Sequence, residues 1–338
     1  MNESRDILQY LHYHPLSSRG DITAGTAFKG SDATLKRVIA AGIKAGDIVV
    51  EGKARATRYR LSPQSQLLMP LNLDTYFALE VDERQVQSSY NFELINGLLA
   101  DKEQAHLDAL QDEFRQHVNE LTDNEYRKEM ERLGIDLSWK SSQIEGNTYT
   151  LLETERLLRE SKTAEGKTKE EAVMLLNHKD ALSFILDNPD YLQELTVSHI
   201  EDIHQLLTKD LSIDKGLRHH RVGITGTNYH PLDNEFQIRE AMRDACKLIN
   251  SKYNIFEKAL LTLLLLSYIQ PFLDGNKRTA RITSNAILIA NDYCPLSFRS
   301  IDSIDYKKAM LIFYEQNNLY AFKQIFIEQF EFAVKEYF

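Results

Sequence analysis

One short stretch constrains this chain more than any other: a strongly apolar run that stops at a proline and leads into a cluster of cations. Residues 259–269 read ALLTLLLLSYI, and residues 270–281 read QPFLDGNKRTAR. The run is about half of the ~20 residues that a membrane-spanning helix needs, so we expect a buried core helix and no membrane segment. Apolar positions at helical spacing resume with Ile282, Ala286 and Ile289. The sequence therefore predicts two core helices joined by a short loop.

The residue types of this loop suit an anion. A helix N-terminus offers free N–H groups and the positive end of a dipole. Gly275 allows close approach of the backbone to a ligand, Asn276 adds amide donors, and Asp274 is an oxygen ligand suited to Mg²⁺. Three cations follow: Lys277, Arg278 and Arg281. Such a loop is typical of a nucleotide polyphosphate site, and the alternative is an ordinary helix N-terminus capped by Asp274.

Residues 270–281 resemble the signature loop of the Fic family, whose pattern reads His-Pro-Phe-x-(Asp/Glu)-Gly-Asn-(Gly/Lys)-Arg-x-x-Arg. Every patterned position matches except the first, which is Gln270. Residues 141–146, SSQIEG, match the family's inhibitory helix, (Ser/Thr)-x-x-x-Glu-(Gly/Asn), and residues 215–231 resemble the β-hairpin flap that precedes the loop. The resemblance covers about residues 121–338 and implies a mostly α fold with a Fic-type helical core, including an inhibitory helix around residues 141–147.

Members that match the full pattern transfer AMP from ATP to a Ser, Thr or Tyr hydroxyl of a protein. The resemblance therefore implies ATP and Mg²⁺ as cofactors and a protein substrate as partner. By the same resemblance Asp274 would hold the metal, and Gly275 and Asn276, beside Lys277, would form the anion-binding nest. Arg278 would contact the β- and γ-phosphates.

The resemblance also implies a switch. Arg281 would bind the γ-phosphate, or Glu145 in an autoinhibited state, with Ser141 and Gly146 in the same inhibitory segment. A charge-assisted pair of this kind cannot coexist with a bound γ-phosphate, because one guanidinium cannot satisfy both partners. The flap would align the target segment by strand addition through Thr225, Gly226, Thr227, Tyr229 and His230.

Gln270 departs from the family pattern at the position of greatest consequence. The family has a His there, which takes the proton from the attacking hydroxyl, and Gln270 has no titratable group. Loss of a general base typically costs on the order of 10²–10⁴ in rate, while positioning and charge stabilisation can leave residual transfer. Gln270 could orient the hydroxyl, another base such as His230 could serve, or the Gln could be an engineered change. A reaction with another group donor also stays open.

Residues 1–62 form a separate unit in this interpretation. We expect short helices around Ile7–Leu11, over 21–28 and over 32–45, the last capped by Ser31 and stopped by Gly46, and then a hairpin over 48–61. This order resembles a winged helix-turn-helix domain. The unit has ten Lys and Arg against six Asp and Glu, a net charge of +4, whereas the whole chain carries −10. DNA is therefore a candidate partner, and a surface for protein contacts or a homodimer is the alternative.

The remaining predictions concern organisation and compartment. Residues 63–70 read as a linker within a connector over 63–120; residues 73–120 read as mostly helical, with an apolar stripe at Leu107, Leu110, Phe114, Val118 and Leu121. The Fic core occupies residues 121–338. Two cysteines exclude a disulfide framework and favour the reducing cytoplasm. A second functional hypothesis is an ATP-sensing pseudoenzyme that regulates DNA through residues 1–62.

Overall fold

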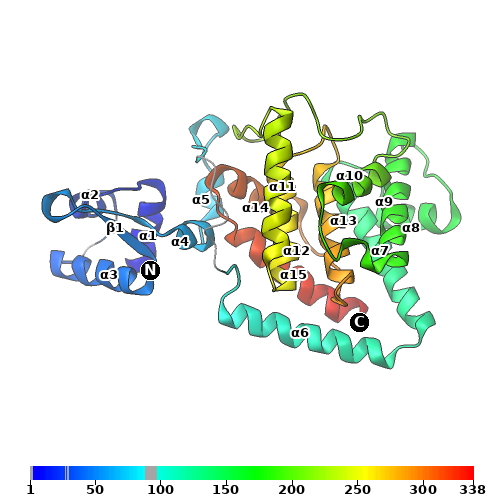
Figure 1. Ribbon diagram of the computed structural model, residues 1–338, viewed down its shortest axis with the longest axis horizontal. Coiled ribbons are helices and arrows are strands. Elements are labelled where there is room, and N and C mark those ends of the chain that lie inside the picture. Colours follow the sequence, from blue (N-terminus) through cyan, green and yellow to red (C-terminus); the bar gives the residue numbers. More distant parts are fainter. Residues whose placement is uncertain (1–2, 27, 29, 88–96) are drawn as a thin grey trace.

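The computed structural model describes residues 3–26, 28, 30–87 and 97–338. Helices dominate it (Figure 1). They are α1 (Glu3–Tyr13), α2 (Arg19–Gly25), α3 (Asp32–Ala45), α4 (Pro63–Leu68), α5 (Leu73–Phe77), α6 (Asp101–Glu120), α7 (Asp123–Ile144), α8 (Leu151–Glu160), α9 (Lys169–Asp187), α10 (Val197–Leu207), α11 (Glu235–Ser251), α12 (Ile255–Ile269), α13 (Asn276–Ile289), α14 (Ser303–Gln316) and α15 (Tyr320–Tyr337). The strands are β1 (Ile48–Glu51) and β2 (Arg58–Leu61), and 3₁₀ turns lie at Ala54–Ala56, Val81–Glu83 and Pro189–Leu192.

The N-terminal unit has the expected order of three helices followed by a two-stranded antiparallel sheet. The Ser31 side chain accepts a hydrogen bond from the backbone N–H of Thr34, and Gly46 ends α3 in the left-handed region at φ 82°. The strands pair in the register Ile48↔Leu61. The second helix ends at Gly25 instead of Phe28. The sequence signals thus predicted the elements of this unit, and their resemblance to a winged helix remains a prediction.

Helix α12 is the centre of the large helical body. Its residues from Ala259 to Ser267 are buried on all sides, as an almost uniformly apolar helix requires. It packs most extensively against α13, and the signature residues begin in the loop between the two helices and continue into α13. The first was predicted from its continuous apolar run, and the second from apolar positions at helical spacing.

The start of the connector, residues 63–70, differs from the prediction. Residues 63–70 are not a simple linker, because Pro63 begins α4 and Leu67 is completely buried in the main core. Residues 73–120 contain the short α5, one 3₁₀ turn and the long α6, and part of the stretch between α5 and α6 lies outside the described residues. The expected stripe on α6 is buried at Leu107, Leu110 and Phe114, with Val118 packed partly against the core. Short helices with few apolar positions carry too little periodicity to be recognised.

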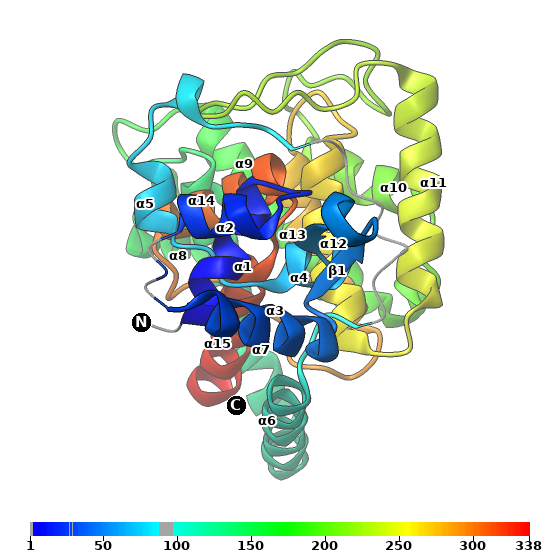
Figure 2. The same ribbon diagram turned by 90° about the vertical axis from the view of Figure 1, so that its left-hand side faces the viewer.

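The N-terminal unit is attached to the rest of the molecule through α14. Its apolar cluster includes Ile312 of α14 together with Met69, Leu71 and Tyr76 of the connector. Figure 2 shows α1, α2 and α3 in front of the larger helical body. Helix α14 therefore packs against the N-terminal unit as well as within the large helical body.

The β-hairpin expected within residues 215–231 is wrong in its secondary structure. This segment has a turn at Thr225–Gly226 and no strand pairing, and the sheet that the described residues contain is β1–β2. Side chains from other parts of the chain hydrogen-bond to its backbone, so the segment keeps its position without hydrogen bonds between paired strands. None of the described helices has the length and apolarity to cross a bilayer.

Candidate active site

The loop between α12 and α13 is built around two left-handed residues. Gln270 caps α12 at φ 51°, and Gly275 caps α13 at φ 79°. The amide of Gln270 is buried, and its Nε2 donates to the carbonyl oxygen of Ser267 at 2.6 Å. The Asn276 side chain braces the loop by accepting from the N–H of Phe272 and donating to its carbonyl, both at 2.8 Å. Asn276 therefore uses its side chain to shape the loop, and its contribution to an anion would come from its backbone N–H.

Arg278 is the buried cation of the loop. Only 1% of this residue is exposed, and its Nη2 lies 3.3 Å from Asp274 Oδ2. Its Nε and Nη1 are buried and have no hydrogen-bond partner among the described residues. Burial lowers the pKa of the guanidinium, against the opposing effects of Asp274 and Glu145. Buried donors without partners are rare, so these two are available to an anionic ligand.

Arg281 donates four hydrogen bonds to the end of α7 and to α14. Its Nε donates to Ser141 Oγ at 2.8 Å, and its Nη2 donates to the Ser141 carbonyl at 2.9 Å and to Glu145 Oε1 at 3.1 Å. Its Nη1 donates to the Tyr306 hydroxyl at 3.2 Å. The resemblance implies that Arg281 and Glu145 meet, and the two side chains are in contact in the structure.

The carboxylate of Glu145 lies among three cations. Burial would raise its pKa, but Arg281, Lys277 and Arg278 outweigh burial and lower the pKa below its ordinary value. The Nζ of Lys277 is 3.8 Å from Glu145 Oε2. Glu145 itself ends α7, and Gly146 follows with φ 100°. The charge of Glu145 therefore occupies a place that favours an anion.

Two buried histidines support the loop and the arginine pair. His178 of α9 lies 2.9 Å from Ser141 Oγ, and because that oxygen also accepts from Arg281, its proton points to His178 Nε2. His204 of α10 stacks on Phe272 with ring centroids 3.8 Å apart and contacts the Asp274 carbonyl at 3.0 Å. Burial lowers the pKa of His204 to about 4 and that of His178 well below 6.5. Both rings are therefore neutral at pH 7.

A cavity of about 380 Å³ opens above the loop. Its polar lining includes Gln270, Asp274, Asn276, Lys277 and Glu145. Apolar side chains come from three elements: Ile144 at the end of α7, Val222 and Ile224 of the irregular segment (residues 221–231), and Met310 and Leu311 of α14. A compact ligand that carries both charged and apolar groups fits this lining.

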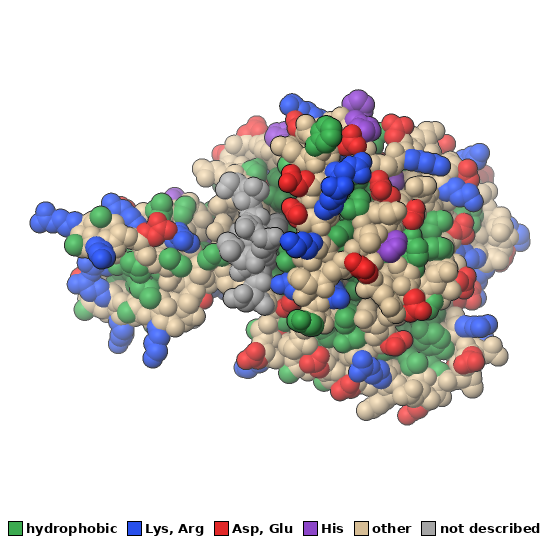
Figure 3. Space-filling view, in the orientation of Figure 1, with side chains coloured by type: hydrophobic (Ala, Val, Ile, Leu, Met, Phe, Trp, Pro, Cys, Tyr) green, Lys and Arg blue, Asp and Glu red, His purple; other side chains and the backbone are tan. Residues whose placement is uncertain are grey.

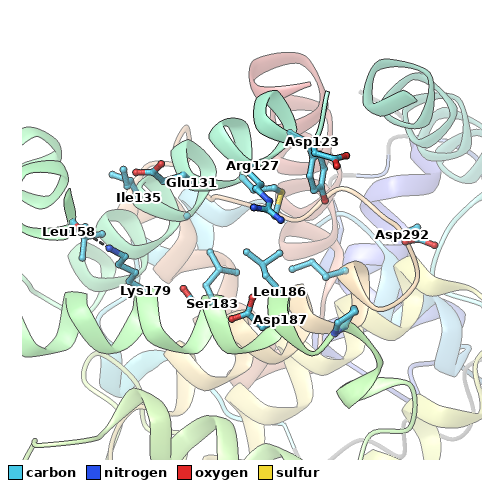
Figure 4. Close-up of a pocket in the computed structure, with 16 residues that line it drawn as sticks. Asp123, Arg127, Glu131, Ile135, Leu158, Lys179, Ser183, Leu186, Asp187 and Asp292 are labelled. Carbon is cyan, nitrogen blue, oxygen red and sulfur yellow. Dashed lines mark hydrogen bonds between the residues drawn. The ribbon is translucent and has the colours of Figure 1, made fainter. Parts of the chain in front are cut away.

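A larger cavity of about 710 Å³ lies elsewhere, between α7 and α9 (Figure 4). Its lining includes Arg127, Glu131, Lys179 and Asp187, and no residue of the signature loop contributes to it. The Lys179 ammonium already donates to the Leu158 carbonyl at 2.6 Å. This cavity is separate from the candidate active site.

Arg218 connects the irregular segment (residues 221–231) to the loop between α12 and α13. The guanidinium of this buried residue donates to the carbonyl oxygens of Gln270 at 2.6 Å, His220 at 2.8 Å and Leu232. Of the residues assigned to the flap, Thr225 lines the cavity, and the buried Tyr229 donates to the Tyr268 carbonyl at 3.0 Å. Gly226 makes the turn at φ 85°, the Thr227 hydroxyl accepts from the Tyr229 N–H, and His230 is exposed.

Sequence reasoning missed four residues that build this site: Arg218, His178, His204 and Tyr306. Isolated histidines at helical spacing carry no site signal, and His178 lies 37 residues from Ser141 along the chain. Arg218 was part of the segment thought to resemble the flap, but its contacts depend on carbonyl groups, which any sequence supplies. Only the fold brings these partners together.

Comparisons with known proteins agree with this geometry. A model of the Fic/DOC family matches residues 194–288. Protein adenylyltransferase Fic of Nematostella vectensis is 29% identical over 175 residues, or 50% of this chain and 40% of that protein. The corresponding protein of Drosophila willistoni is 28% identical over 159 residues, or 45% of this chain and 31% of that protein. The chain thus spans less than half of these curated relatives.

Solved structures share the fold. Fic-1 from C. elegans matches with a TM-score of 0.60 at 21% identity, covering 70% of this chain and 72% of that one. A Fic family protein from Desulfovibrio desulfuricans G20 matches with a TM-score of 0.58 at 18% identity, covering 70% and 74%. The family match spans α10 to α13 and so includes the loop with its arginines. The chain therefore contains a Fic/DOC-family domain.

Proposed function

We propose that this chain transfers AMP from ATP to a Ser, Thr or Tyr hydroxyl of a protein, that Glu145 restrains the reaction, and that Gln270 weakens it. The observation that carries the proposal is Arg278. Its buried Nε and Nη1 have no partner among the described residues, and it lies in the first turn of α13, where the helix dipole favours an anion. A polyphosphate would supply the acceptors.

The residues of the loop suit ATP with Mg²⁺. A Cβ at Gly275 would lie 3.4 Å from both Arg278 Nη2 and Thr208 Cγ2, so the loop is packed tightly around this glycine and leaves little room for a side chain. Asp274, whose side chain is 62% exposed, offers a free carboxylate edge beside this glycine. The described residues contain no cluster of three or more metal-ligating side chains. Asp274 would therefore share Mg²⁺ with phosphate oxygens and water, as is usual for this ion, which neutralises phosphate charge when bound.

The chain's own groups would then bind and orient the reactants. Backbone N–H groups of residues 276–278 and the guanidinium of Arg278 would hold the β- and γ-phosphates. The acceptor oxygen would form a bond to the α-phosphorus while the bond to pyrophosphate breaks. The Nε2 of Gln270 already donates to the Ser267 carbonyl, so its Oε1 would be the atom that orients the acceptor hydroxyl of the target protein. It cannot take up the proton, which would pass to solvent.

Glu145 would restrain this reaction by occupying Arg281. The carboxylate contacts the guanidinium and lines the cavity, so a γ-phosphate reaching Arg281 would have to displace it. Two anions in one place repel, and the loss of Glu145 would favour the nucleotide.

Labelled nucleotide tests the proposal. We expect label from α-³²P-ATP, but not from γ-³²P-ATP, to enter protein, more in Glu145→Gly than in the unmodified chain and more again after Gln270→His is added. Label from γ-³²P-ATP alone would indicate a kinase reaction and overturn the proposal. ATP binding without any label in all variants would favour the sensor hypothesis instead.

A specific observation favours DNA as a further partner of the N-terminal unit. Figure 3 shows Lys and Arg side chains projecting from this unit. On α3 and the turn between the strands the exposed cations are Lys36, Arg37, Lys44, Lys53 and Arg55. Cations on one helix and an adjacent turn are suited to the phosphates of a duplex.

A gel shift tests this second candidate. We expect the chain to retard duplex DNA in 50 mM salt and to lose most of that affinity at 200 mM, because phosphate contacts release counterions. Arg37→Ala with Arg55→Ala should weaken binding at every salt concentration. Arg156→Ala with Arg159→Ala on α8 removes the same charge elsewhere and should have no effect. Equal losses in both pairs would mean that net charge, and not this surface, controls binding.

A further inference from the structure

We propose that Arg84 of the connector is a positioning residue for the reaction, because it holds residues 222–227 over the nucleotide cavity. The inference rests on the proposed function, since a transfer reaction is what this segment would serve. Arg84 lies 142 residues before its acceptor in the segment, the carbonyl oxygen of Gly226, to which its Nη2 donates at 2.6 Å.

The guanidinium of Arg84 is fixed from several sides. Its side chain is 4% exposed, and its Nη1 lies 3.4 Å from Oε1 of Glu315, which is 1% exposed. Its Cζ lies 5.1 Å from the centre of the Phe77 ring and 5.9 Å from that of Tyr76. A planar cation held by a buried carboxylate and two rings has little rotational freedom. Arg84 can therefore present one N–H to the segment in a defined direction.

Gly226 is the point where such a hold matters. Arg218 fixes the chain on either side of residues 222–227, at His220 and Leu232, and makes no contact with the turn at Gly226. Val222, Gly223, Ile224 and Thr225 line the cavity next to Gln270 and Asp274. The connector adds a second contact, because Asn228 Nδ2 donates to the Val81 carbonyl at 3.1 Å. The turn is therefore held from the connector and its ends from the loop.

Glu315 links this hold to the N-terminal unit. The Tyr76 hydroxyl donates to Glu315 Oε2 at 2.5 Å, and Gln316 Nε2 donates to that hydroxyl at 3.1 Å. His12 of α1 lies 3.2 Å from Gln316 Oε1. If Arg84 served only to attach the N-terminal unit, its functional contacts would be those with Glu315 and the two rings. If it is a positioning residue, its bond to Gly226 also limits the mobility of the turn, and that mobility can be measured.

A nitroxide at Thr225→Cys reports the mobility of the turn in the full chain, because the two natural cysteines are buried. The parent carries Glu145→Gly. We expect Arg84→Met and Arg84→Lys each to raise the population of the mobile spectral component by about tenfold, as for the loss of a hydrogen bond from a charged donor. In the same variants without Thr225→Cys, ATP affinity should stay within twofold, and incorporation of α-³²P label into protein should fall at least fivefold.

The partner variant separates the two roles. Glu315→Gln keeps an acceptor for Tyr76 and for Arg84 and leaves the bond from Arg84 to Gly226 in place, so it should raise the mobile component far less than Arg84→Met does. The inference is overturned if Arg84→Met leaves the spectrum unchanged, if Arg84→Lys restores it, or if Glu315→Gln mobilises the turn equally. A parent that incorporates no label would count against the proposed function alone, because the spectra do not depend on transfer.

Discussion

The contact between Glu145 and Arg281 can be tested as a competition between two anions for one guanidinium. Arg281 is 0% exposed at its side chain, whereas the side chain of Glu145 is 20% exposed. Removal of one partner from a fully buried pair costs about 3–5 kcal/mol. In Glu145→Gln the guanidinium keeps its three contacts to Ser141 and Tyr306, and the amide can still accept one bond. We therefore expect a loss of about 2 kcal/mol in the free energy of unfolding without nucleotide.

The same 2 kcal/mol should reappear in binding. If the carboxylate competes with a phosphate for Arg281, its removal should raise the affinity for ATP by about 30-fold, since about 1.4 kcal/mol corresponds to a factor of ten. Titration calorimetry with ATP and Mg²⁺ measures the affinity, and thermal unfolding with and without nucleotide measures the stability.

Glu331→Gln provides the matched control. Glu331 pairs with Lys335 on the surface of α15, and such pairs are typically worth less than about 1 kcal/mol. This variant should change neither stability nor ATP affinity appreciably. Should Glu145→Gln lose stability while its ATP affinity changes by less than threefold, the two anions do not compete and the restraint by Glu145 is refuted.

Three further predictions follow from contacts in the loop and from the buried histidines. Gln270→His in the Glu145→Gly background should accelerate α-label transfer by about 10²–10⁴ with a rate that declines below the pKa of the new His; an unchanged rate would show that residue 270 does not face the acceptor. Asn276→Ala should cost about 1–3 kcal/mol in urea unfolding, because both backbone groups of Phe272 lose their buried partner, whereas Asn291→Ala, at a half-buried helix end, should cost less. Burial lowers the pKa of His12 and of His204 from 6.5 to about 4, so the unfolded chain binds more protons than the folded chain between these pH values. The stabilising contribution of the two neutral rings should therefore be complete above pH 6.5 and decrease as the pH falls toward 4. His204→Gln should reduce this loss of stability in unfolding measured as a function of pH, and an unaltered slope would exclude His204 as a source.

Local signals predicted the elements whose chemistry lies within a few residues. Ser31 caps the start of α3 and Gly46 caps its end, as their residue types predict. The apolar run before Gln270 forms the buried α12. The short α4 escaped prediction, because six residues cannot display a helical period. The turn at Thr225–Gly226 was mistaken for a hairpin, because β-branched residues beside a glycine suit either structure.

The candidate site could be predicted only where a spacing pattern names its residues. The loop and Glu145 came from such a pattern, and they do lie together. The supports come from elsewhere: Arg84 and His178 reach the site through contacts that span long stretches of the chain. Such contacts depend on how helices pack, and packing partners are not encoded in any one window of sequence.

The way Arg281 is held has a consequence for how the restraint would be relieved. Ser141 lies in the final turn of α7 and Glu145 caps that turn, and together they accept three of the four hydrogen bonds that Arg281 donates. Unwinding that single turn at Gly146 would break all three at once and leave the tyrosine hydroxyl as the remaining partner. Release would therefore be all-or-none, and any signal that melts one turn of helix would act as a complete trigger.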